Sequence, residues 1–263
     1  MSATLRITAC IVTYRSPIEQ VRAAVASFLS TPLPVAISII DNDSGADYVQ
    51  ALRQIEGITL IEAGANKGYG AGHNIGFAKA PASDYHLILN PDVVIHEGTL
   101  QAMTDYMDAN PDIGLLAPKV QNADGSLQPL NKRLPTVFDL FARRFLPKRV
   151  QQKNPYVQRK MARYEMRDVS YDKIIDVPFI SGCFMLFRSE VLRRVGGFDT
   201  RYFMYLEDCD ITRRTSAIAR CVYYPNASIT HHWARGSHKS WRLLRVMLHS
   251  MWVYFNSWGW RWI

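Results

Sequence analysis

A short acidic stretch in the last quarter of the chain has the composition of a site for proton transfer or metal binding. Residues 205–214 read YLEDCDITRR and place Glu207, Asp208 and Asp210 directly before two arginines. Carboxylates can bind a cation or act as a general base, and acidic side chains also stabilise the first turn of a helix. On a helix, Glu207 and Asp210 share a face, whereas Asp208 lies about 100° from Glu207. Asp210 can pair with an arginine three or four positions later, so the three acids are not expected to converge on one atom.

Other candidate ligands follow short apolar segments. Asp92 ends LILNPD two residues after Asn90. A carboxylate there suits Mg²⁺ or Mn²⁺ held against a diphosphate, and a simple Asx-Pro turn is the alternative. Asp41 ends ISIID, where it can bind a base or ribose or can cap a helix. His231 and His232 follow a strand-like run, and only one of them can face a metal because strand neighbours point to opposite faces; a purely structural role is the alternative.

The glycine-rich stretch NKGYGAGHNIG, residues 66–76, does not have the spacing of a dinucleotide-binding loop. The position of the third glycine in G-x-G-x-x-G holds His73 or Ile75, and the P-loop pattern is absent. What remains is a turn between a strand and a helix. Its N–H groups and Lys67 can face an anion, or the loop is purely structural.

These residues lie at the ends of elements that alternate in type. Apolar, β-branched runs predict strands at 5–13, 35–41, 57–62 and 85–90, and helical periodicity predicts helices near 17–29, 46–55, 71–80 and 97–109. The alternation predicts an α/β fold with a mostly parallel central sheet flanked by helices. Ligands of such sheets bind beyond the carboxyl ends of the strands, where the polar residues above are found.

The pattern is less regular after residue 118. Residues 122–129 have the composition of a hairpin turn, and the basic segment 131–172 predicts helices or a mobile excursion. A strand within 176–187, a helix starting at 189–190, and a pair of strands at 219–225 and 228–232 are expected next. The last 25 residues have helical spacing to about residue 256.

Composition limits the classes of protein. The chain has 263 residues, a net charge of +8 and four scattered cysteines. No apolar run is long enough to span a bilayer and the N-terminus lacks the pattern of a signal peptide, so we expect a cytoplasmic protein with free thiols. The charge predicts an anionic partner: nucleic acid, a phosphorylated small molecule or the inner leaflet of the membrane. No RRM, helix-turn-helix or zinc module is present, which argues against nucleic acid.

Six segments together resemble a known family. CIVTYRSP, IIDNDSG, NKGYGAGHNIGF, LILNPDV, GCFMLFRSEVLRRVGGFDTRYFMYLEDCDITRR and HHWARGSHKS occur in the order seen in the second family of inverting glycosyltransferases, which have the GT-A fold. The set is most like that of bacterial rhamnosyltransferases of O-antigen and cell-wall polysaccharide synthesis. The resemblance spans residues 7 to 258.

The resemblance implies a role for each candidate residue. It assigns the nucleotide to Thr13, Tyr14 and Asp41, and the nucleotide or its sugar to Asn66, Lys67, Gly68 and Asn74. Asn90-Pro91-Asp92 stands where the family carries a D-x-D metal motif, so Asp92 is the expected ligand of Mg²⁺ or Mn²⁺ and Asn90 is placed with the nucleotide-sugar. His231 matches a position near the metal, with His232 as the alternative. Asp208 matches the catalytic base, and Glu207 supports it or contacts the acceptor.

The resemblance also implies substrates and a division of the chain. The expected donor is dTDP-L-rhamnose, with UDP- and GDP-sugars as alternatives, and the expected acceptor is a polyprenyl-diphosphate-linked saccharide at the inner face of the cytoplasmic membrane. Residues 1–235 would form the GT-A domain, with a nucleotide-sugar half (1–118) and an acceptor and catalytic half (119–235). Residues 236–263 would form an amphipathic, membrane-associating helix. A homodimer contact or packing onto the domain is the alternative for its apolar stripe: Trp241, Leu244, Met247, Leu248, Met251, Trp252, Phe255 and Trp258.

Overall fold

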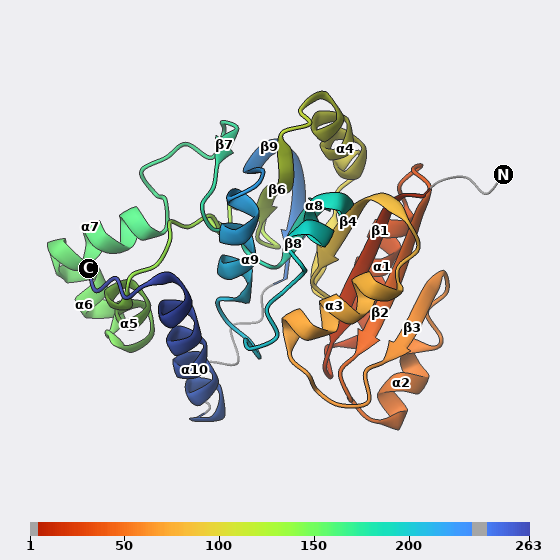
Figure 1. The fold of residues 1–263 in the computed structure, drawn as a ribbon, viewed down its shortest axis with the longest axis horizontal. Coiled ribbons are helices and arrows are strands. Elements are labelled where there is room, and N and C mark those ends of the chain that lie inside the picture. Colours follow the sequence, from red (N-terminus) through yellow and green to blue (C-terminus); the bar gives the residue numbers. More distant parts are fainter. Residues whose placement is uncertain (1–4, 233–240) are drawn as a thin grey trace.

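The computed structural model describes residues 5–232 and 241–263, which form a central sheet covered by helices on both faces (Figure 1). The strands pair in the order β3-β2-β1-β4-β8-β6-β9-β5, and β7 pairs with β9. The strands are β1 (Leu5–Thr13), β2 (Val35–Asp41), β3 (Ile58–Glu62), β4 (Ser83–Leu89), β5 (Val93–Ile95), β6 (Ile113–Gln121), β7 (Ile175–Asp176), β8 (Phe184–Arg188) and β9 (Arg220–His231). The helices are α1 (Ile18–Leu29), α2 (Ala46–Leu52), α3 (Tyr69–Lys79), α4 (Thr99–Ala109), α5 (Val137–Phe145), α6 (Lys148–Lys153), α7 (Pro155–Tyr164), α8 (Ser189–Arg194), α9 (Glu207–Ser216) and α10 (Trp241–Trp258).

The first half of the chain confirms the predicted strand and helix alternation. β1 pairs in parallel with β2 and β4, and β2 pairs in parallel with β3. Helices cover both faces of the central strands, and these strands are therefore apolar on both sides instead of alternating with polar residues. The carboxyl ends of β1, β2 and β4 meet at one edge, where Thr13, Asp41 and Asn90 lie.

The second half makes the sheet mixed. β8 pairs antiparallel with β4 and β6, whereas β6 and β9 are parallel. The two strands predicted at 219–225 and 228–232 are one strand, β9, and the prediction of a pair is wrong. The register between β6 and β9 shifts around Pro225, and a β-bulge there accommodates the missing N–H of the proline. The predicted turn at 122–129 is present, with Asn122 N–H donating to the Ser126 carbonyl over 2.8 Å.

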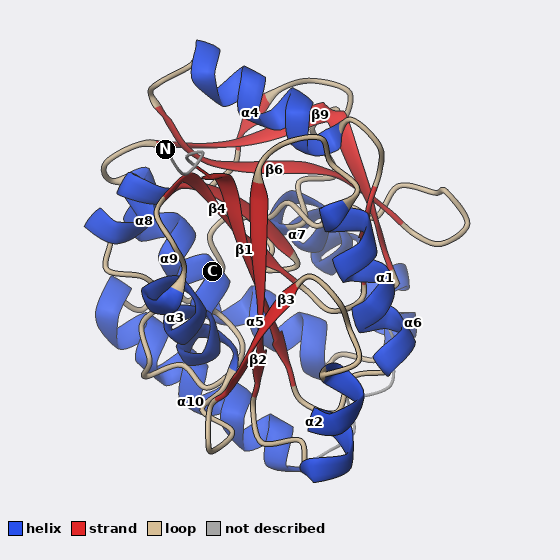
Figure 2. Ribbon diagram, turned by 90° about the vertical axis from the view of Figure 1, so that its right-hand side faces the viewer, coloured by secondary structure: helices blue, strands red, loops and turns tan. Residues whose placement is uncertain are grey.

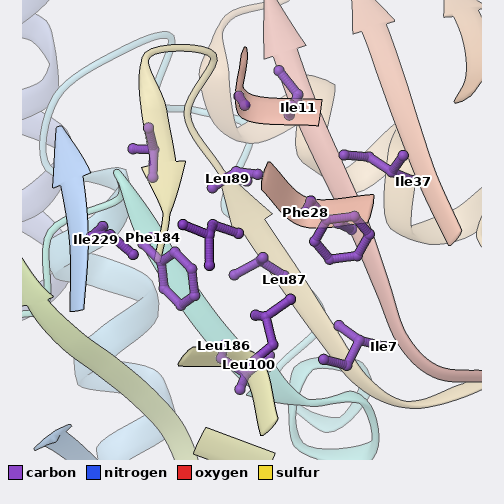
Figure 3. Close-up of a cluster of buried hydrophobic side chains, with 14 of the residues drawn as sticks. Ile7, Ile11, Phe28, Ile37, Leu87, Leu89, Leu100, Phe184, Leu186 and Ile229 are labelled. Atoms are coloured by element: carbon purple, nitrogen blue, oxygen red, sulfur yellow. The ribbon is translucent and has the colours of Figure 1, made fainter. Parts of the chain in front are cut away.

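Two apolar layers hold the helices against the sheet. One layer joins α1 and α4 to the strands through residues such as Phe28, Leu87, Leu100 and Phe184 (Figure 3). The opposite layer places Phe187, Leu192 and Ile211 under α8 and α9. Figure 2 shows helices on both sides of the sheet, which is the arrangement expected of an α/β fold.

The remaining helices gather at one end of the molecule. The basic segment forms α5, α6 and α7, and Figure 1 shows them beside α10 and opposite β1–β3. Val253, Tyr254 and Phe255 of α10 pack with Tyr202 and Leu206 before α9. The predicted apolar stripe is therefore divided, since Phe255 is buried while Trp252 is exposed. Within the described residues, no helix is both long and apolar enough to cross a membrane.

Candidate active site

Asp208 is held in the first turn of α9 by an unusual backbone. Tyr205 and Leu206, directly before the helix, both have positive φ, 74° and 66°. Such a conformation is costly for residues other than glycine and indicates a position fixed for function. The Asp208 carboxylate accepts hydrogen bonds from the N–H of Gly182 over 3.1 Å and of Cys209 over 2.9 Å. The side chain is only partly covered, so it faces the site.

The three acids of this stretch have different environments, as the helical spacing predicts. Asp210 is buried and accepts from Arg214 Nε over 2.8 Å and from Trp258 Nε1 over 2.8 Å, which makes it structural. Glu207 is also buried, and burial together with the charge of Asp208 raises its pKa well above the usual value. Burial raises the pKa of Asp208 as well, but the Lys132 ammonium and the two N–H donors oppose the rise. Of the three acids, Asp208 alone is only partly covered and accepts hydrogen bonds from N–H donors that favour its charged form.

Asp92 and His231 face each other at the opposite side of the site. His231 Nε2 lies 3.4 Å from Asp92 Oδ1, an atom that is buried and has no hydrogen bond. His231 Nδ1 lies 2.7 Å from Gln128 Oε1, and Gln128 Nε2 donates to Asn122 Oδ1 over 2.8 Å. Because the Gln128 oxygen only accepts, Nδ1 carries the proton and the lone pair of Nε2 points toward Asp92.

This donor set fits a divalent cation. A carboxylate oxygen without a hydrogen bond and an imidazole lone pair at 3.4 Å are two acceptors that a metal ion would join. His232 is exposed, and its N–H donates to the Asp92 carbonyl, so His231 is the histidine that faces Asp92. Across residues 5–232 and 241–263, no cluster of three His, Cys, Asp or Glu side chains suits a metal.

The segment from Phe179 to Cys183 connects the two sides. Its Gly182 N–H donates to Asp208, and its Cys183 carbonyl accepts from the N–H of Asn90 over 2.9 Å. The Gly182 carbonyl accepts from the Tyr69 hydroxyl over 2.5 Å. The proposed base and the loop that carries Asp92 are therefore fixed to adjacent residues of one segment.

The strand ends of the first half form a linked polar edge. The Thr13 carbonyl accepts from the N–H of Asn42, whose side chain donates to the Gly68 carbonyl over 3.0 Å. Asp41 Oδ2 accepts from the N–H of Ser44, while its Oδ1 is buried without a partner. An acceptor of this kind fits the hydroxyl or N–H donors of a nucleoside. The Thr13 hydroxyl already pairs with Tyr48 over 2.7 Å, whereas Tyr14 is exposed at the edge.

Two N–H groups of the glycine-rich loop donate to other parts of the protein, whereas the sequence suggested that such groups could face an anion. The N–H of Gly68 donates to Asn66 Oδ1, and that of Tyr69 donates to the Phe203 carbonyl, so these two donors are already occupied. A Cβ on Gly76 would lie 2.2 Å from Cys10 Sγ, which shows that this glycine lets α3 pack closely on β1. Lys67 is exposed at the loop and has the reach that an anion contact needs.

Asn74 is also occupied by the protein. Its Nδ2 donates to the Phe198 carbonyl and its Oδ1 accepts from the Phe198 N–H, each over 2.8 Å. This reciprocal pair favours a role in positioning the loop before α9 over direct contact with a nucleotide.

Sequence reasoning did not identify four residues of the site: Gln128, Lys132, Gly182 and Tyr69. Gln128 pairs with His231 and Gly182 with Asp208, whereas Tyr69 reaches the site through Gly182 and Lys132 acts on Asp208 electrostatically. All four act across long sequence separations. The only available signal was the predicted turn at 122–129, which places Gln128 next to a strand end.

The polar strand ends, the Asp92–His231 pair and Asp208 are compatible with glycosyl transfer, and comparison with known proteins gives the family. Residues 8–196 match glycosyl transferase family 2, and the chain belongs to that family. It is 31% identical to the N-acetylglucosaminyl-diphospho-decaprenol L-rhamnosyltransferase of Mycobacterium tuberculosis, over 92% of this chain and 84% of that protein. It is 28% identical to the rhamnosyltransferase WbbL of Escherichia coli, over 78% of this chain and 75% of that protein.

Solved structures have the same fold. A mannosyltransferase from Pyrobaculum calidifontis, in complex with GDP-Man and Mn²⁺, superposes with a TM-score of 0.63 at 16% identity, over 97% of this chain and 65% of its own. GalNAc-T7 with UDP, GalNAc and Mn²⁺ gives a TM-score of 0.64 at 13% identity, over 89% of this chain. This chain spans 44% of GalNAc-T7, so the likeness concerns the GT-A domain alone.

Proposed function

We propose that this glycosyltransferase moves L-rhamnose from dTDP-L-rhamnose onto a polyprenyl-diphosphate-linked saccharide of the GlcNAc type, in the synthesis of bacterial surface polysaccharide. The observation that carries the catalytic part is the partly covered carboxylate of Asp208, which accepts from the N–H of Cys209 and from the N–H of Gly182, in the segment that also holds the Asp92 loop. The substrates are supported by the names of the two relatives, both rhamnosyltransferases.

The residues then divide the reaction between them. Asp41, Thr13, Tyr14, Asn66 and Lys67 bind the nucleotide-sugar, with Gly68 and Asn90 shaping the same edge. Asp92 and His231 would hold Mg²⁺ or Mn²⁺, which neutralises charge on the departing nucleoside diphosphate.

Asp208 accepts the proton of the acceptor hydroxyl as that oxygen attacks the anomeric carbon. Neutral Glu207 beside it adds no second negative charge to the acceptor side. A single carboxylate suffices for direct displacement, which inverts the anomeric centre, whereas glycoside hydrolases need a pair.

We propose that the protein associates peripherally with the inner face of the cytoplasmic membrane, where a lipid-linked acceptor is found. Exposed large apolar side chains are concentrated on α5–α7, α10 and the tail that follows α10: Phe141, Phe145, Val150, Tyr156, Trp241, Leu248, Trp252, Trp260, Trp262 and Ile263. Arg143, Arg149 and Arg159 are exposed on the same helices. Aromatic and basic side chains together favour an anionic lipid interface over a homodimer contact.

The test is a matrix of dTDP-, UDP- and GDP-sugars against a GlcNAc acceptor carried on a lipid diphosphate, with Mn²⁺ or Mg²⁺ and product detection by mass. The proposal expects a deoxyhexose added from dTDP-L-rhamnose. Transfer only from a UDP- or GDP-sugar, or equal transfer to a soluble sugar, would support the alternatives. Salt-sensitive DNA binding without nucleotide-sugar binding would contradict the whole assignment.

A further inference from the structure

Lys132 is a buried cation on which the charge of Asp208 acts without a direct ion pair. The residue is 8% exposed, and its Nζ lies 4.5 Å from the centre of the Phe179 ring. In the part of the chain that the structure describes, no carboxylate lies within ion-pair distance of this ammonium. Burial lowers the pKa of Lys132 to about 8. A buried ammonium is costly unless it is paired, so its retention points to a ligand that supplies the negative charge.

The position of Lys132 places it at the active site. Its N–H donates to the Phe179 carbonyl over 3.2 Å, at the start of the segment that reaches Asp208 through Gly182. The charges of Asp92, Lys132 and Asp208 all contribute to the pKa of the Cys183 thiol in that segment. Lys132 is therefore linked to the proposed base through Phe179 and the segment that ends at Gly182.

A second cation, Arg143 of α5, acts electrostatically on Lys132. Its charge contributes to the lowered pKa of Lys132 and opposes the rise in the pKa of Tyr164. Two neighbouring cations repel each other, and a bound anion with two or more charges removes that repulsion. Arg143 is exposed, and Phe141 and Phe145 of the same helix are exposed as well, so this cation lies on a helix that also presents apolar side chains.

We propose that Lys132 and Arg143 bind the diphosphate of the lipid-linked acceptor. This inference rests on the proposed function and adds the residues that select a diphosphate acceptor. The donor diphosphate belongs with Asp92 and His231, whereas Lys132 interacts electrostatically with Asp208, where the acceptor hydroxyl must lie. The prenyl chain then leaves the site along the exposed aromatic residues of α5.

The experiment uses the full chain with two acceptors, a short-chain prenyl-diphospho-GlcNAc and an alkyl GlcNAc glycoside without phosphate. Lys132→Gln is expected to raise KM for the diphosphate acceptor at least about 10-fold, the loss of a charge-assisted contact. It should lower kcat/KM for the diphosphate acceptor relative to kcat/KM for the alkyl glycoside by about the same factor, and it should leave the affinity for dTDP with Mn²⁺ unchanged. Arg143→Gln, an exposed change that spares the core, should act in the same direction, and Lys132→Arg should restore most of the affinity.

Lys79→Gln is the matched control, because it removes one exposed positive charge at the end of α3 and should change none of these values. Equal losses on both acceptors, with a shifted pH profile, would mean that Lys132 only tunes Asp208 and would overturn the proposal. Weaker dTDP binding would assign Lys132 to the donor and would also overturn it. If the wild type transfers to neither acceptor, the proposed function fails, and binding of farnesyl diphosphate still tests the subsite: unchanged affinity in Lys132→Gln refutes it.

Discussion

The chemistry of the site depends on carboxylates that are adjacent in sequence but differ in environment. Asp208 keeps two N–H donors and a nearby ammonium, whereas Glu207 is enclosed and has a buried oxygen, Oε2, without a partner. Donors to a carboxylate stabilise its charged form, and burial destabilises it. Both carboxyl groups therefore have raised pKa values, and Asp208 is the one whose charged form is favoured by N–H donors and an ammonium.

Asp208→Asn removes the proton acceptor without changing the size of the side chain. We expect transfer to fall by about 10²- to 10⁴-fold, the range associated with general base catalysis. The affinity for dTDP with Mn²⁺ should be unchanged, because the base acts on the acceptor. Initial rates and calorimetric titration with dTDP measure the two effects. Near-normal turnover would refute the assignment of Asp208.

Glu207→Gln should change how stability depends on pH. The pKa of Glu207 is raised in the folded state, so its protonated form contributes stability that is complete below the ordinary glutamate pKa. That contribution is lost as the pH rises through the raised pKa. Urea unfolding at a series of pH values should show a decline in the wild type that Glu207→Gln lacks. Glu190→Gln, an exposed change, is the control and should follow the wild type.

Asp92 and Gln128 test the proposed metal site in two ways, since Asp92 would bind the ion and Gln128 positions His231. Asp92→Ala should abolish the metal dependence of dTDP binding. Gln128→Leu removes the acceptor that fixes the His231 ring and should weaken Mn²⁺-dependent binding by about 10- to 100-fold. Titration of Mn²⁺ by EPR in the presence of dTDP gives these affinities directly. Unchanged Mn²⁺ affinity in both variants would contradict the proposed metal site.

At the scale of elements, the sequence predicted the strands and helices that a local apolar pattern determines. All four strands and four helices predicted before residue 110 are present, because apolar periodicity and strand-end polar residues define each βα unit. Short β5 and the pairing of β6 with β9 were not predicted. Both depend on pairing between strands that are about a hundred residues apart in the sequence. The bulge near Pro225 interrupts the pattern of β9, so that one strand has the sequence pattern of two.

The same distinction applies to the site. Asp41, Asn90 and Asp92 follow strands and are visible in the sequence. Lys132 lies close to the segment that contacts Asp208 because it pairs with Phe179. The sequence around residue 132 predicts neither this pairing nor a site.

Gly68 joins the glycine-rich loop to the segment before α9. It has a φ of 89°, and a Cβ there would lie 2.2 Å from the Phe203 carbonyl oxygen. Gly68→Ala should displace this segment, destabilise the protein by more than the roughly 1 kcal/mol that left-handed strain alone costs, and lower transfer. Gly64→Ala is the matched control, since Gly64 has a φ of 72° and open space around it. Equal unfolding free energies for the two variants would show that the contact with Phe203 is unimportant.

At the scale of the whole molecule, the exposed aromatic residues lie at the end formed by α5–α7 and α10, while the strand ends with Asp41 belong to the other half (Figure 1). The tail binds α5 directly, because the N–H groups of Val137 and Phe138 donate to the carbonyls of Arg261 and Trp262. α10 also packs on the segment before α9, so the proposed membrane surface is structurally continuous with the helix that carries Asp208.

This continuity gives a prediction for lipid binding. The double variant Trp252→Glu and Trp262→Glu should greatly reduce co-sedimentation with vesicles that contain anionic lipid, because it adds negative charge to an interfacial surface. Ile218→Glu changes an exposed apolar residue just after α9 and should bind as the wild type does. Equal vesicle binding by all three proteins would place the membrane contact elsewhere or exclude it.

In this account the nucleotide diphosphate is held near Asp92 and His231, and the acceptor hydroxyl is deprotonated at Asp208 across the sugar. The most direct test is the anomeric configuration of the transferred sugar, read from the one-bond carbon–proton coupling of the purified product. Direct displacement assisted by one base predicts a configuration inverted relative to that of the donor. A product that retains the configuration of the donor would contradict the mechanism and the role of Asp208.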